Sequence, residues 1–71
     1  MKKYRHYKNQ KTYTLLHEAW DTERKEKVVV YRGEYSCAEL GKNPIFTRNK
    51  DEFFSSVINS EGEEVLRFES L

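Results

Sequence analysis

Residues 27–32 constrain the fold more than any other stretch of the chain. They read Lys-Val-Val-Val-Tyr-Arg and hold the longest run of β-branched residues in the sequence. Valine side chains are stiff at χ1 and pack well on a pleated surface, so the stretch favours a β-strand. A short apolar run bounded by polar residues is typical of a strand that is covered on both faces. We therefore expect an interior strand in a sheet or small barrel.

The length of the chain limits what can be built around this strand. Seventy-one residues suffice for one domain, residues 1–71, with a small core. Aromatic residues make up 14% of the chain, so they must supply much of that core. Cys37 is the single cysteine, which excludes an intramolecular disulfide and a cysteine-rich zinc site.

The net charge and the hydropathy of the chain indicate where in the cell the protein resides. The net charge is +1, which gives no bulk attraction to nucleic acid or to a membrane. The basic start of the chain lacks the apolar segment of a signal peptide, and no apolar run approaches membrane-spanning length. We expect a cytoplasmic protein that makes no contact with a membrane.

The charges are distributed unevenly along the chain. Residues 1–17 hold five Lys or Arg and no acid, whereas residues 51–71 hold six acids and one Arg. The two ends are then either neighbours that offset each other, or the N-terminal segment forms a basic surface that binds an anion.

A second strand is expected before the valine run. Residues 4–7 form a short extended segment, a polar turn follows, and residues 12–20 favour β structure. The wholly polar residues 21–26 predict a hairpin loop, so residues 12–20 pair antiparallel with residues 27–32. By alternation, one face of this second strand is expected to hold Tyr13, Leu15, His17 and Ala19.

Further elements are expected in the second half. Residues 45–48 predict a third strand, and Asn49 is placed as the N-cap of a helix of one or two turns. Residues 57–59 and 64–68 flank a turn with one glycine and predict a closing hairpin. Residues 33–44 form the longest irregular stretch. Its expected anchors to the body are Tyr35, Cys37 and Leu40.

These elements predict a mainly β fold: a small, partly open β-barrel of five or six short strands with one short helical turn. Several residues also stand in an order that resembles a known family. They are Tyr4-Arg5-His6-Tyr7-Lys8 near the start, Val29-Val30-Tyr31-Arg32, Arg48 with Phe53 five positions on, and Arg67-Phe68 near the end. The chain resembles the bacterial family catalogued as domain of unknown function 1653. The resemblance implies an SH3-like barrel and assigns no activity.

The chain departs from that family's usual pattern at three positions. Asn9 stands where the family usually has Gly, Phe46 where it has Trp, and Asn49 where it has Pro. Residues 36–43 also differ from the pattern. These departures affect the first turn and the long loop rather than the fold.

No pattern in the sequence indicates catalysis. His6 and His17 lack a nucleophile partner in a recognisable context, and no spacing predicts a metal site or a phosphate loop. We expect His17 to be an ordinary side chain on a mostly apolar strand face. The chain is therefore expected to be no enzyme and to carry no cofactor or metal.

Four arginines, each beside an aromatic residue, are the strongest lead. If they meet, their guanidinium groups can form an anion pocket or a surface for single-stranded nucleic acid. The alternative is that each arginine pairs with a nearby acid. The four are Arg5, Arg32, Arg48 and Arg67, and the candidate acids are Glu18, Glu23, Glu34 and Glu69.

The tyrosines allow a further interpretation. Tyr7, Tyr13, Tyr31 and Tyr35 resemble the aromatic groove with which SH3 domains accept an extended peptide, or they simply fill the core. Our preferred hypothesis is a non-catalytic binding module for a protein partner or a small anionic ligand, with a possible homodimer through an edge strand. The alternative is a nucleic-acid-binding accessory domain that uses the N-terminal basic and aromatic residues. The candidate ligand-binding residues are Tyr4, Arg5, His6, Tyr7, Tyr31, Arg32, Tyr35, Arg48 and Arg67.

Overall fold

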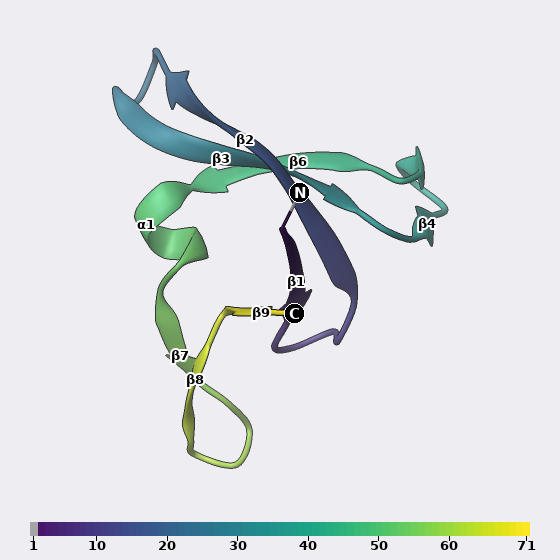
Figure 1. Ribbon diagram of the computed structural model, residues 1–71, viewed down its shortest axis with the longest axis vertical. Helices are drawn as coiled ribbons and strands as arrows, with labels where there is room; N and C mark the ends of the chain where they lie inside the picture. Colours follow the sequence, from purple (N-terminus) through teal and green to yellow (C-terminus); the bar gives the residue numbers. More distant parts are fainter. Residues whose placement is uncertain (1) are drawn as a thin grey trace.

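A five-stranded antiparallel sheet forms the body of the protein (Figure 1). The computed structural model describes residues 2–71 of the chain. The sheet has the strand order β6-β3-β2-β1-β9, so β6 and β9 are its two edges. Its strands are β1 (Lys3–His6), β2 (Thr12–Asp21), β3 (Glu26–Gly33), β6 (Ile45–Asn49) and β9 (Phe68–Ser70).

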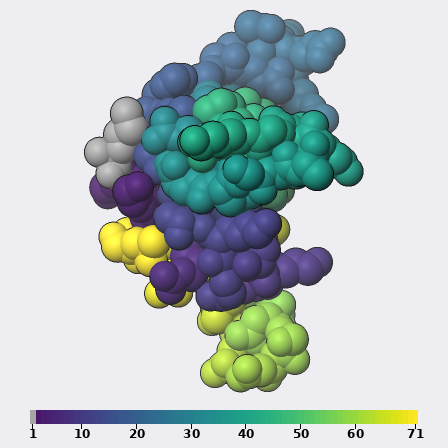
Figure 2. Space-filling model, turned by 90° about the vertical axis from the view of Figure 1, so that its right-hand side faces the viewer, coloured from purple at the N-terminus to yellow at the C-terminus, as the bar shows by residue number. Residues whose placement is uncertain are grey.

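One helix and two small hairpins complete the described part of the chain. Helix α1 (Lys50–Phe53) follows β6 directly. Strands β4 (Ser36–Cys37) and β5 (Gly41–Lys42) form one hairpin, and β7 (Ser56–Ile58) and β8 (Glu64–Leu66) form the other. The second hairpin projects from the body, as the light green segment of Figure 2 shows.

The prediction of a mainly β fold with one short helical turn is confirmed, as is its partly open character. The edge strands β6 and β9 do not pair with each other, so the sheet is not closed into a barrel. The described residues form nine short strands rather than five or six, because two two-residue strands interrupt the expected long loop and the last strand is divided.

The valine run lies in β3, which is an interior strand between β6 and β2. The predicted hairpin with residues 12–20 is confirmed, since β2 and β3 pair antiparallel from Tyr13↔Gly33 to Asp21↔Glu26. The expectation that both faces of the run are buried is wrong. Val29 is fully buried, whereas Val28 and Val30 are half-buried. Alternation points Val29 at the core, and the other face of the sheet has only partial cover.

A β-bulge in β2 changes which residues share a face. The register shifts between Leu15 and His17, after which His17 stands opposite Val30 and Glu18 opposite Val29. One extra residue in a strand reverses the direction of all side chains that follow it. The predicted common face of Tyr13, Leu15, His17 and Ala19 is therefore wrong. Tyr13 and Leu15 face the core, whereas His17 and Ala19 are exposed on the opposite side.

The core is built mostly of aromatic rings, as the composition predicts. Phe53 of α1 is fully buried and stacks on Phe68, with ring centroids 4.0 Å apart. The predicted cap of this helix is confirmed, because the Asn49 side chain accepts a hydrogen bond from the backbone nitrogen of Glu52 at 2.9 Å. The buried apolar residues are Tyr4, Tyr13, Val29, Tyr31, Phe53 and Phe68.

Two further expectations need correction. Tyr35 packs against the core, but Leu40 is 59% exposed and does not anchor the 33–44 segment. The last hairpin does not continue into one strand over residues 64–68, because the chain turns at Arg67 from β8 into β9. The Arg67 backbone nitrogen donates to the carbonyl oxygen of Ser55 there, and its carbonyl accepts from Tyr7.

The two ends of the chain are neighbours. Strand β1 pairs antiparallel with β9, and Arg5 stands opposite Glu69. This confirms the expectation that the basic start and the acidic end lie side by side. Within residues 2–71, no helix combines the length and the apolar character that a membrane crossing requires.

Candidate functional site

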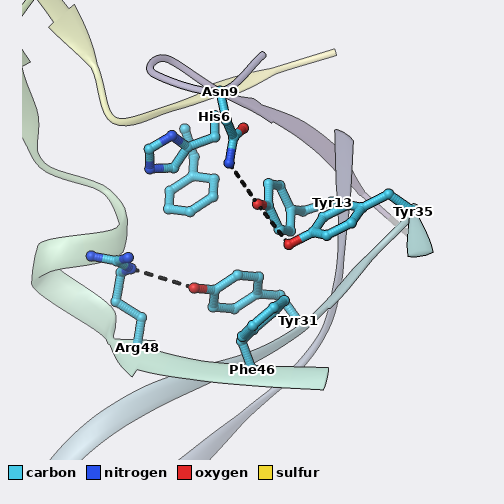
Figure 3. A pocket seen from close by; sticks show the side chains of 8 residues that line it. His6, Asn9, Tyr13, Tyr31, Tyr35, Phe46 and Arg48 are labelled. Carbon is cyan, nitrogen blue, oxygen red and sulfur yellow. Dashed lines mark hydrogen bonds between the residues drawn. The ribbon is translucent and has the colours of Figure 1, made fainter. Parts of the chain in front are cut away.

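A cavity of about 180 Å³ opens on the face of the sheet that carries the core, which we call the core face (Figure 3). Each of the five strands of the sheet contributes at least one side chain to it, and the β1–β2 turn and the segment after β3 add one each. We call this site the aromatic pocket. It is lined by His6, Asn9, Tyr13, Tyr31, Tyr35, Phe46, Arg48 and Phe68.

Strand register explains why these residues meet. His6 stands opposite Phe68 on β9, and Tyr31 stands opposite Phe46 on β6. Arg48 lies two residues after Phe46, so both side chains emerge on the same face of β6. The core face is shared with helix α1, whose Phe53 packs against Tyr31 and Phe68.

Aromatic rings form the walls of the aromatic pocket. The Tyr13 and Tyr35 rings meet edge to face with centroids 5.6 Å apart, and the Tyr31 and Phe46 rings lie 5.6 Å apart at a tilt of 32°. The Tyr35 ring lies over Gly33, where an added Cβ would stand 2.6 Å from Tyr35 Cε1. Only glycine therefore lets the Tyr35 ring approach this closely.

The hydroxyl groups of Tyr13 and Tyr35 together leave one proton without an acceptor among residues 2–71. Asn9 Nδ2 donates to the Tyr13 hydroxyl at 3.0 Å, and the two hydroxyls lie 3.2 Å apart. Two hydroxyls carry two protons, and one hydrogen bond between them uses one. The second proton is available to a ligand, whichever residue holds it. Asn9 turns its Nδ2 rather than its Oδ1 toward this pair, and the Oδ1 accepts from the Lys11 backbone nitrogen at 2.8 Å.

Arg48 supplies the charge of the aromatic pocket. Its Nε donates to the Tyr31 hydroxyl in a long hydrogen bond of 3.4 Å, and its Nη1 donates to Glu52 Oε1 at 2.6 Å. Because the Tyr31 oxygen accepts here, its own proton remains free to donate. The Nη2 group of Arg48 makes no hydrogen bond to the part of the chain that the structure describes.

His6 is held as a neutral donor. Its Nδ1 accepts a hydrogen bond from the Lys8 backbone nitrogen at 3.1 Å, so the ring proton lies on Nε2. Burial lowers the pKa of His6 below its ordinary value of 6.5, and the positive charges of Arg48, Arg67 and Lys8 lower it further. Both effects favour the uncharged ring.

The aromatic pocket thus presents donors rather than acceptors. Asn9 Oδ1 and His6 Nδ1 are both engaged by backbone nitrogens, whereas protons remain on the tyrosines, on Arg48 and on His6. Burial and the hydrogen bond with Tyr13 raise the pKa of Tyr35, which keeps its hydroxyl protonated. Lys11 Nζ lies 4.3 Å from the centroid of the Tyr35 ring and adds a second positive charge. Such a site suits a ligand group that is negative and rich in acceptors.

The nine ligand-binding residues predicted from the sequence fall into three groups in the structure. Four of them, His6, Tyr31, Tyr35 and Arg48, line the aromatic pocket. Tyr4 is buried in the core, where its ring meets that of Phe53 edge to face at 5.4 Å. The remaining four lie outside the aromatic pocket and are Arg5, Tyr7, Arg32 and Arg67.

The four arginines do not meet in one cleft, so the interpretation of one shared arginine pocket is wrong. Arg5 alternates with the core-facing Tyr4 and His6 and is exposed on the outer face of the sheet. Arg32 alternates with Tyr31 in the same way and pairs with Glu34 at 3.1 Å, as the alternative interpretation had it. Only Arg48 and Arg67 come together.

Arg48 and Arg67 share Glu52 as a partner. Arg67 Nε donates to the Glu52 carbonyl oxygen at 3.2 Å, whereas Arg48 binds the Glu52 carboxylate. Tyr7 lies instead beside a second hollow of about 290 Å³. That hollow lies between the β1–β2 turn and the β7–β8 hairpin and is lined by Tyr7, Lys8, Ile58, Asn59 and Ser60.

The candidate set missed four lining residues. Tyr13, Phe46 and Phe68 follow from the strand register, because each alternates onto the core face opposite a residue that was named. Asn9 carries no signal in the sequence beyond its place in a polar turn. Among residues 2–71, no three His, Cys, Asp or Glu side chains gather as they would around a metal ion.

Fold and site together define a small, mainly β domain with a basic, aromatic pocket on the core face of an open sheet. The chain belongs to the family described as protein of unknown function (DUF1653), whose model matches residues 2–70. This confirms the resemblance drawn from the sequence. Neither a curated protein nor a solved structure matches the chain.

Proposed function

We propose that the protein is a non-catalytic binding module whose aromatic pocket takes a small anionic ligand, or one anionic group of a protein partner. The observation that carries the proposal is the excess of free donors around Arg48. Asn9 Oδ1 and His6 Nδ1, the two acceptor atoms without a proton, already accept hydrogen bonds from backbone nitrogens. The Tyr31 hydroxyl, the Tyr13–Tyr35 pair and Arg48 Nη2 still have protons to donate.

The size of the aromatic pocket supports a small ligand group. Its volume of about 180 Å³ lies below the roughly 300–1,000 Å³ of pockets that hold drug-sized molecules. A carboxylate or phosphate with few attached atoms fits this space. The aromatic rings that line the cavity leave fewer sides of such a group open to water, which strengthens its hydrogen bonds to the donors.

The polar side chains of the aromatic pocket support binding rather than catalysis. The Tyr35 hydroxyl has a raised pKa, so it is a poor nucleophile. His6 Nδ1 is occupied by the Lys8 backbone and does not activate a hydroxyl group. These features fit groups that hold a ligand in place.

The alternative function, binding of nucleic acid, has less support. The basic residues of β1, Lys3 and Arg5, alternate with the core-facing Tyr4 and lie on the outer face of the sheet, away from the rings of the aromatic pocket. A surface for single-stranded nucleic acid usually combines basic and aromatic side chains on one face. The family resemblance and the composition further support a bacterial, cytoplasmic protein as part of the proposal.

A titration with benzoate and its neutral isostere benzamide tests the proposal. We expect benzoate to shift the NMR signals of His6, Tyr31 and Arg48 in a saturable way, and benzamide to bind about tenfold more weakly or not at all. Inorganic phosphate in a third titration separates a preference for phosphate from one for carboxylate. Equal binding of benzoate and benzamide, or no saturable shift with either anion, would overturn the proposal.

Two matched variants locate the binding site. Arg48→Gln removes the free donor and the charge, and we expect it to weaken benzoate binding about tenfold or more. Arg5→Gln removes the same charge from the exposed outer face and should leave the affinity unchanged. Equal losses in both variants would indicate a nonspecific effect of charge.

A further inference from the structure

We propose that the anionic group is the carboxylate of an aspartate or glutamate on an extended peptide segment of a partner protein, which adds to the open edge of β6 as a sixth strand. This inference rests on the proposed function and names the class of ligand. Two separate features of the molecule support it, and both lie along the same strand.

The first feature is the free edge of β6. This strand is five residues long and pairs only with β3 in the part of the chain that the structure describes. Asn49 also begins helix α1, but residues 45–48 make no backbone hydrogen bond to a turn or loop within residues 2–71. An edge of this kind presents unpaired N–H and C=O groups, and an extended peptide can pair with them.

The second feature is that β6 also forms one wall of the aromatic pocket. Phe46 and Arg48 point from β6 into the cavity, as Figure 3 shows along its lower side. In a strand added to β6, side chains on the same face would lie about 4.5–5.5 Å from Phe46 or Arg48, measured between Cβ atoms. A glutamate there can reach the Arg48 guanidinium while its backbone pairs with β6.

Charge selects an acidic side chain for this position. Arg48 and Lys11 carry positive charge in the aromatic pocket and at its rim, and Glu52 binds only the Nη1 group of Arg48. The free protons described above require an acceptor. The opposite edge of the sheet is less suited to such a peptide. Strand β9 is only three residues long and carries Glu69, which would repel an acidic segment.

Matched peptides test the inference. The probe is the acetylated and amidated pentapeptide Thr-Val-Glu-Val-Thr, compared with its Gln analogue and with N-acetylglutamate amide, which cannot form a strand. We expect the Glu peptide to bind about tenfold more tightly than either comparison compound. The amide protons of residues 45–49 that face the open edge should become protected from hydrogen exchange on its addition, whereas those bonded to β3 are already protected.

Two N-methylated versions of the Glu peptide probe strand addition directly. In an extended peptide, alternate amides face opposite edges. Methylation of the amides that face β6 should abolish the gain over N-acetylglutamate amide, whereas methylation of the other set should not. Equal effects of the two methylation patterns would overturn the inference.

The experiment separates this inference from the proposed function. If benzoate binds but the Glu peptide binds no more tightly than N-acetylglutamate amide, the strand addition is wrong and anion binding stands. If neither binds, the proposed function itself is wrong. In Arg48→Gln the preference for Glu over Gln should disappear, while Arg5→Gln should retain it. A dimer in light scattering at the concentration of the titration, with residues 45–49 protected from exchange in the absence of peptide, would place a second copy on the edge and overturn the inference.

Discussion

The neighbours of His6 determine the protonation state of its side chain and its role in the aromatic pocket. The Lys8 backbone nitrogen occupies Nδ1, the Phe68 ring packs 4.8 Å from the imidazole, and Arg48 lies close enough to disfavour a second positive charge. All three contacts favour the neutral ring, and the Lys8 hydrogen bond places its proton on Nε2. The imidazole can therefore act as a donor in the aromatic pocket without adding charge.

The lowered pKa of His6 makes the stability of the fold depend on pH. The unfolded chain takes up a proton near pH 6.5, whereas the folded chain does so only at lower pH. Below 6.5 the unfolded state binds more protons, so the full stability is present above 6.5 and is lost as the pH falls through the folded value. We expect the free energy of unfolding to decrease from about pH 7 to about pH 5.

Urea denaturation at stepped pH values measures this decrease. The His6→Gln variant should show a smaller decrease over the same range, because the titrating group is gone. An NMR titration of the His6 ring gives the midpoint directly. A midpoint at or above 6.5 would contradict the prediction.

At the scale of residues, the sequence identifies the chemistry of the aromatic pocket but not the full set of residues that line it. His6, Tyr31, Tyr35 and Arg48 were recognised because aromatic and basic side chains near strands are a general sign of a binding site. Arg32 was wrongly assigned to the binding site. Its side chain lies on the outer face of the sheet, because the alternate residues of β3 face the core. That direction is set by cover from other elements, which no local pattern reports.

Among the elements, α1 shows how much a cap residue can contribute. Asn49 accepts from the Glu52 backbone nitrogen at 2.9 Å, and its Nδ2 donates to Glu26 Oε2 at 2.8 Å. The first bond satisfies a free N–H of the helix, and the second ties the helix start to β3. Both bonds help to hold Phe53 against the sheet.

We expect Asn49→Ala to lower the free energy of unfolding by about 1–2 kcal/mol, because it removes both hydrogen bonds. Asn49→Ser is the matched control, since serine retains the cap but cannot reach Glu26. It should cost less than the alanine variant. Urea denaturation followed by circular dichroism measures both, and equal stability of Asn49→Ala and the parent would contradict the role of the cap.

Elements with a local signature could be predicted, and those without one could not. The β2–β3 hairpin, strand β6 and the Asn49 cap follow from polar turns, β-branched runs and capping residues. The bulge at Leu15/His17 and the turn at Arg67 leave no such mark in the sequence. The turn at Arg67 depends on backbone hydrogen bonds with Ser55 and Tyr7, which are distant from it along the chain.

For the whole molecule, stability depends on one layer of rings between the sheet and α1. Phe53 is fully buried and stacks on Phe68, while its neighbour Phe54 is 42% exposed. The sheet is open and the domain is small, so no second core can compensate for a loss here.

We expect Phe53→Ala to cost about 3–5 kcal/mol, which is close to the total stability of a domain of this size, so that much of the protein unfolds at 25 °C. Phe54→Ala removes the same atoms from a partly exposed site and should cost about 1 kcal/mol or less. Far-ultraviolet circular dichroism and urea denaturation compare the two variants. Similar losses in both would contradict the assignment of Phe53 to the core.

The pairing of β1 with β9 brings the start and the finish of the chain to one corner, where the Leu71 backbone nitrogen donates to the Lys3 carbonyl oxygen at 2.9 Å. A short linker can bridge two points this close. The chain can then be opened at the exposed 22–25 turn to make a circular permutant, or inserted whole into a surface loop of a host protein, with all five strands still paired.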